Sequence, residues 1–113
     1  MNKCIIESSS SYGATALLRT IAKADIRFDE IQLNVKDYVT DSTDSNLWPL
    51  IIKCSTTELN NEEFEIRIHS LTCGYPGAGP RDLVECIKIT GFDHCISEKE
   101  IFSNKNIIAK FKK

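Results

Sequence analysis

The sequence predicts an α+β fold in which an antiparallel sheet of about five strands carries two helices on one face, in the order β-α-β-β-β-α-β. Apolar and polar residues alternate over Ile31–Val35 and Phe64–Ile68, which is the two-residue period of a strand with one buried face. Apolar residues between Tyr12 and Ala24 instead recur at helical spacing. The loops between the middle strands are too short for a helical crossover, so these strands are expected to pair antiparallel with helices on one side.

In the first half of the chain, residues 3–7 are expected to form a short strand, followed by a helix over Tyr12–Ala24. The apolar stripe of this helix consists of Ala14, Leu17, Leu18, Ile21 and Ala22. A strand around Ile31–Val35 leads into a polar loop over Val39–Asn46, and a further strand covers Leu47–Ser55. Pro49 is expected at the start or edge of that strand, because proline cannot donate to a strand ladder.

In the second half, a strand from Phe64 is followed by a glycine-rich loop over Gly74–Gly79. Pro80 suits the first position of a helix, and Gly91 is expected to end that helix. A short strand around Asn106–Phe111 completes the sheet.

Length and composition predict one soluble domain over residues 1–113. The composition is 42% hydrophobic and 27% charged, which is typical of globular proteins and argues against disorder. No apolar run approaches the roughly 20 residues that span a bilayer, and Glu7 interrupts the first segment before a signal-peptide core forms. A cytoplasmic location is therefore expected. The five cysteines, with no Cys-x-x-Cys, are then expected to be reduced and largely buried.

Charge is unevenly distributed along the chain. Between Asp37 and Glu65 seven acids face one base, Lys53, for a net −6, whereas eight bases face five acids from Ile66 onward. Nucleic-acid binders usually carry a dominant basic patch. The acidic segment instead favours a basic protein partner, with neither nucleic acid nor membrane expected. The acids expected to contact that partner are Asp41, Asp44, Glu58, Glu62, Glu63 and Glu65; the alternative is an ordinary solvated surface.

The sequence offers weak candidates for catalysis or metal binding. Cys73, with His69 or His94 as base, is the one nucleophile pair worth considering, and no orienting acid is evident. His69 and Cys73, together with the adjacent His94 and Cys95, lack the short paired spacings of structural zinc sites. We therefore expect no enzyme activity, no metal and no cofactor.

The most unusual stretch is the loop Cys73-Gly-Tyr-Pro-Gly-Ala-Gly-Pro-Arg81. It could act as an anion cradle made of helix N-terminal amides and Arg81. It lacks the Gly-Lys-Ser/Thr of a P-loop and the third glycine of a dinucleotide fingerprint. The alternative is a tight structural connection in which glycines adopt positive φ. The residues concerned are Gly74, Tyr75, Gly77, Gly79 and Arg81.

The run Gly74-Tyr75-x-Gly77-x-Gly79-Pro80-Arg81, with the apolar positions that follow to Phe92, resembles a Gly-Tyr-x-Gly-x-Gly-Pro signature. This signature is associated with small bacterial immunity proteins encoded beside contact-dependent or polymorphic toxins. The resemblance covers about 20 of the 113 residues. It implies an antitoxin that binds one cognate toxin domain, often a nuclease, and blocks it stoichiometrically.

Three functions therefore remain open. The first is a stoichiometric immunity protein, and the second is a small-ligand or anion-binding module that uses the Gly74–Arg81 loop. The third is an assembly subunit whose sheet edge pairs with another chain.

Overall fold

The computed structural model describes residues 4–8, 11–37, 48–56 and 62–113. Its strands are β1 (Cys4–Ser8), β2 (Ile26–Lys36), β3 (Leu50–Thr56), β4 (Glu63–Ile68) and β5 (Asn106–Lys112). Its helices are α1 (Ser11–Ala22), α2 (Ala78–Thr90) and α3 (Glu98–Ser103). The loop expected over Val39–Asn46 lies outside the described residues.

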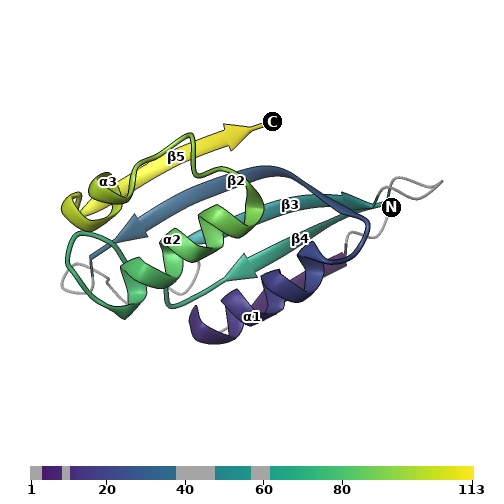
Figure 1. The fold of residues 1–113 in the computed structure, drawn as a ribbon, viewed down its shortest axis with the longest axis horizontal. Coiled ribbons are helices and arrows are strands. Elements are labelled where there is room, and N and C mark those ends of the chain that lie inside the picture. Colours follow the sequence, from purple (N-terminus) through teal and green to yellow (C-terminus); the bar gives the residue numbers. More distant parts are fainter. Residues whose placement is uncertain (1–3, 9–10, 38–47, 57–61) are drawn as a thin grey trace.

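The five strands form one sheet in the order β1-β4-β3-β2-β5 (Figure 1). The pairs β2·β3, β3·β4 and β2·β5 are antiparallel, so the predicted meander is confirmed. β1 pairs in parallel with β4, which makes the sheet mixed. The path of the chain explains this. The crossover through α1 makes β1 and β2 run in the same direction. β3 then reverses the direction and β4 reverses it again, so β4 is parallel to β1.

The helices α1 and α2 lie side by side on one face of the sheet, as predicted (Figure 1). Their buried side chains, such as Leu18 in α1 and Leu83 in α2, pack against the centres of the strands. Ile31, Ile52 and Ile66 there are fully buried. In the described residues no helix covers the opposite face, which we call the open face.

A β-bulge in β2 places Glu30 on the open face. The register shifts between Phe28 and Glu30, leaving Asp29 as the extra residue. Phe28 and Ile31 therefore both point into the core although they are three residues apart. Glu30 is placed opposite Lys53 of β3. The sequence predicted this strand only from Ile31, because the bulge breaks the alternation that identifies a strand.

The second helix begins at Ala78, two residues before the predicted start at Pro80. Gly91 ends it as predicted, with a left-handed φ of 83° and its N–H bonded to the carbonyls of Ile87 and Lys88. The predicted strand start at Leu47 is also moved, because β3 begins at Leu50. Pro49 directly precedes β3, and its carbonyl accepts the N–H of Asn34.

The prediction of two helices missed α3, which spans only six residues. Ser97 and Glu100 form a capping box at its start, and Ile101 is its buried residue. A helix this short has too few apolar positions to show a 3.6-residue period. Within the described ranges, no helix is long and apolar enough to cross a membrane.

Candidate functional site

The glycine-rich loop is filled by the side chain of Tyr75. The Tyr75 hydroxyl lies 2.7 Å from Oγ1 of Thr72. A Cβ on Gly77 would collide with the Tyr75 ring, and a Cβ on Gly79 would collide with Oγ1 of Thr72. Gly74 has a φ of +82°, and a Cβ there would come within 2.9 Å of the Asn104 carbonyl oxygen. Close packing therefore explains all three glycines without a ligand.

The start of α2 is also poorly equipped to hold an anion. Pro80, the third residue of the helix, has no N–H, and the Arg81 N–H donates to the Gly77 carbonyl. Pro80 thus removes one of the four amides that a helix leaves without an intrahelical partner at its N-terminus. The Arg81 side chain is exposed.

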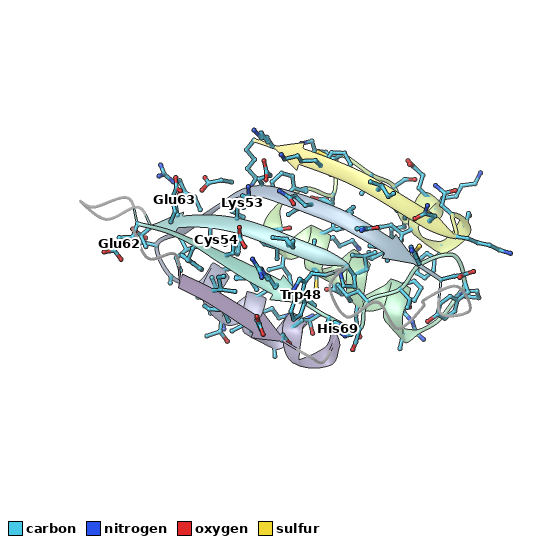
Figure 2. All side chains as sticks on the ribbon, turned by 180° about the vertical axis from the view of Figure 1, so that it is seen from behind. Trp48, Lys53, Cys54, Glu62, Glu63 and His69 are labelled. Atoms are coloured by element: carbon cyan, nitrogen blue, oxygen red, sulfur yellow. The ribbon has the colours of Figure 1, made fainter. Side chains whose placement is uncertain are left out.

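The six predicted partner-binding acids separate into three groups. Asp41, Asp44 and Glu58 lie outside the described residues. Glu62 and Glu63 are exposed at the start of β4, where the Glu62 N–H donates to Oγ1 of Thr56 (Figure 2). Glu65 is buried, and its carboxylate lies 3.1 Å from the Arg67 guanidinium. Its negative charge is therefore already compensated within the protein.

Cys73 lacks the features of a nucleophile. Its side chain is fully buried, and its thiol donates to the Val35 carbonyl oxygen at 3.6 Å. Burial, helped by the charge of Asp37, raises the pKa of Cys73 to about 11, so the reactive thiolate is disfavoured. His69 instead packs edge-on against the Trp48 ring, with the ring centroids 5.5 Å apart.

The other predicted metal and thiol residues do not gather into a site. Burial is also the main cause that raises the pKa of Cys54 and of Cys86 to about 12. Cys95 is half-buried and His94 is exposed. No group of three or more His, Cys, Asp or Glu side chains in the described ranges is placed to hold a metal ion.

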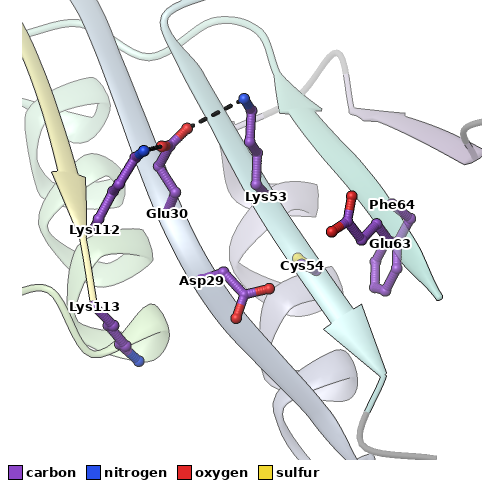
Figure 3. Close-up of a pocket in the computed structure, with 8 residues that line it drawn as sticks. All are labelled: Asp29, Glu30, Lys53, Cys54, Glu63, Phe64, Lys112 and Lys113. Atoms are coloured by element: carbon purple, nitrogen blue, oxygen red, sulfur yellow. Dashed lines mark ion pairs between the residues drawn. The ribbon is translucent and has the colours of Figure 1, made fainter. Parts of the chain in front are cut away.

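The open face carries a cluster of three lysines around one carboxylate. Glu30 of β2 has a side chain only 6% exposed. Its carboxylate oxygens lie 3.4 Å from Nζ of Lys53, 3.6 Å from Nζ of Lys112 and 3.9 Å from Nζ of Lys110. Figure 3 shows Glu30 between Lys53 of β3 and Lys112 of β5. We call these three lysines with Glu30 the lysine cluster.

Glu30 is ionised at neutral pH. Burial alone raises the pKa of Glu30, but the hydrogen bond from Gln32 at 2.9 Å and the ammonium groups of Lys53 and Lys110 outweigh it. The net effect places the pKa below the ordinary glutamate value. The cluster therefore holds three positive charges and one negative charge, which leaves it positive.

Next to the lysine cluster lies an apolar hollow of about 480 Å³. Trp48, Ile51, Ile108 and Ala109 supply its apolar wall, and Lys110 supplies its charged side. Ile108 is 74% exposed. Among the described residues, the other exposed large apolar side chain is that of Ile5, at 42%. We call this feature the Trp48 hollow.

The sequence contains signals for the Trp48 hollow that the alternation rule did not use. Successive strand residues point to opposite faces. Two adjacent isoleucines in a strand must therefore place one side chain on each face. Ile51 and Ile52 do this in β3, and Ile107 and Ile108 do it in β5. Paired apolar residues within predicted strands thus indicated an apolar patch on the open face.

Comparison of the chain with protein-family models, curated proteins and solved structures finds no match.

Proposed function

We propose that this protein is a stoichiometric inhibitor of the immunity type, which binds a cognate toxin domain through the open face of its sheet. The observation that carries the proposal is the Trp48 hollow. The centres of protein–protein interfaces are rich in aromatic and other apolar side chains surrounded by a polar rim. Trp48, Ile51 and Ile108 have that arrangement, with charged side chains on the neighbouring strand positions.

The expectation that the partner is a toxin domain rests on the resemblance of the Gly74–Arg81 loop to the immunity-protein signature. The Tyr75 packing makes this loop a structural connection between β4 and α2. A loop of this kind would characterise a fold that related inhibitors share, rather than their contacts with a toxin. The partner would then be a toxin domain, of which a cytoplasmic nuclease is the expected example.

Glu62 and Glu63 add an electrostatic argument for a basic partner. Both are exposed at the end of the open face where β4 begins (Figure 2). A nuclease presents basic residues to its phosphate-rich substrate. Exposed carboxylates at an interface accelerate the encounter with such a surface more than they raise affinity.

The test is co-expression of the protein with the product of the adjacent upstream gene, followed by co-purification and a toxicity-rescue assay. A stable binary complex together with rescue is expected. If the gene product is not toxic, or if no complex and no rescue occur, the proposed function is wrong.

In the same assay, the double change Glu62→Lys and Glu63→Lys is expected to slow association about tenfold at low salt. The matched control is Asp93→Lys with Glu98→Lys, which reverses two exposed acids in the helical layer. Equal association rates for the two variants would show that Glu62 and Glu63 lie outside the interface, and the proposed function would still stand.

The anion-binding alternative has less support, because Tyr75 occupies the loop and Pro80 removes an amide donor.

A further inference from the structure

The open face is organised as a grid whose register is known. One row across the sheet contains Lys53, Glu30 and Lys112, which are direct neighbours on β3, β2 and β5. The next row contains Ile51, Gln32 and Lys110. Residues two apart along a strand are separated by about 7 Å. The lysine cluster and the Trp48 hollow are therefore neighbouring subsites, one residue pair apart.

The three lysines gather around Glu30 within the protein itself. Glu30 is nearly inaccessible to solvent, whereas the side chains of Lys53, Lys110 and Lys112 are 40%, 55% and 68% exposed. One ionised carboxylate thus draws three ammonium groups together and compensates only one of their charges. The positive charge that remains favours an anionic group of a partner at this point.

The Trp48 hollow requires an apolar group on the partner, in addition to the anionic group. Its volume of about 480 Å³ leaves room for a side chain of a partner. Its wall is mainly indole and aliphatic, and Lys110 lies both in this hollow and in the lysine cluster. An occupant that fills the hollow therefore has an anionic group within reach of the cluster.

We propose that the partner inserts one apolar side chain into the Trp48 hollow and places a carboxylate, about 7 Å away, against the lysine cluster. This inference rests on the proposed function and specifies the segment of the toxin domain that is recognised. The partner surface then has two regions of opposite charge. Its basic residues face Glu62 and Glu63, and a segment with acidic and apolar residues lies across β2, β3 and β5.

A protein segment fits this face better than single-stranded nucleic acid does. Nucleic-acid platforms stack successive bases on several aromatic side chains. The wall of the hollow includes one aromatic ring, Trp48, beside aliphatic Ile51 and Ile108.

The experiment measures the dissociation constant of the complex with the adjacent upstream gene product for two single variants. Ile108→Ser removes an apolar contact, and Lys110→Met removes a charge while keeping most of the side-chain stem. Both residues are exposed, so both variants are expected to fold, which thermal unfolding checks. Each is expected to weaken binding by about tenfold or more, as at an interface hot spot. Lys110→Met should also reduce the dependence of affinity on salt.

The matched controls are Ile5→Ser and Lys99→Met. Ile5 lies on the open face in the edge strand β1, beside Glu65, and is exposed. Lys99 is exposed on α3. Both controls are expected to bind within about twofold of the wild type.

Two outcomes separate this inference from the proposed function. If the wild-type complex forms but Ile108→Ser and Lys110→Met bind like the controls, the inference is wrong and the inhibitor function stands. If no complex forms, both are wrong. Binding of a fluorescent 20-nucleotide RNA that is lost in Lys110→Met would assign the face to nucleic acid and overturn the inference.

Discussion

At the scale of single residues, the glycines of the Gly74–Gly79 loop show how a signature can mark packing rather than chemistry. Gly77 has an extended backbone with φ of −167°, which any residue can adopt. It is required because the Tyr75 ring lies where a Cβ would be. Sequence reasoning expected positive φ values there, and within this loop the structure has one only at Gly74. Contacts made by a side chain two residues away are invisible in local backbone preferences.

Gly79→Ala tests this explanation directly. The added methyl group would collide with Oγ1 of the buried Thr72, so Thr72 or the loop must move. Overpacking of this kind costs about 1–3 kcal/mol. We expect that loss in the free energy of unfolding, measured by urea denaturation. Ala78→Ser is the control, because Ala78 is exposed and its variant should change stability by less than about 0.5 kcal/mol. A Gly79→Ala protein as stable as the control would contradict the packing explanation.

At the scale of the elements, local patterns identified every strand and both long helices, and they missed α3. The missed helix nevertheless had a sequence signal, since Ser97 is followed three residues later by Glu100, the spacing of a capping box. In the structure, Oγ of Ser97 accepts the Glu100 N–H at 3.2 Å. The Glu100 carboxylate in turn accepts the Ser97 N–H at 3.4 Å. Capping chemistry identifies a short helix where periodicity does not.

Ser97→Ala removes one half of this box. We expect it to lower the free energy of unfolding by about 1 kcal/mol, the usual cost of losing an N-cap hydroxyl. Chemical denaturation gives the value. Ser103→Ala, at the exposed last residue of the same helix, should have little effect. Equal losses in the two variants would show that the cap does not stabilise α3.

At the scale of the whole molecule, Glu30 connects strands that are far apart in sequence. Lys53 in β3 and Lys112 in β5 reach it from both sides. None of the three residues was predicted as a site residue, because each is an ordinary charged position within its own strand pattern. Their convergence depends on β5 pairing with β2, which places residues 82 positions apart opposite each other.

The lowered pKa of Glu30 predicts how the stability of the protein depends on pH. Since the folded-state pKa lies below the ordinary value, the ionised carboxylate stabilises the fold at pH values above about 4.5, and this contribution is lost as pH falls through the folded-state pKa. Glu30→Gln should therefore be less stable than wild type by about 1 kcal/mol at pH 7, with a difference that shrinks in acid. Thermal unfolding across pH measures it. Glu98→Gln, whose carboxylate forms an exposed pair with Lys88, should show a smaller difference at pH 7.

The sequence by itself determined the class of the fold, the antiparallel meander and, apart from α3, the positions of the elements to within about five residues. It did so because the alternation of burial along a strand or helix is recorded locally in residue order. Only the tertiary structure decided that β1 lies parallel to β4 and that Tyr75 fills the glycine-rich loop. The lysine cluster and the Trp48 hollow also arise only when β2, β3 and β5 lie side by side. Residues distant in the chain become neighbours through strand pairing, and no local pattern records which strands pair.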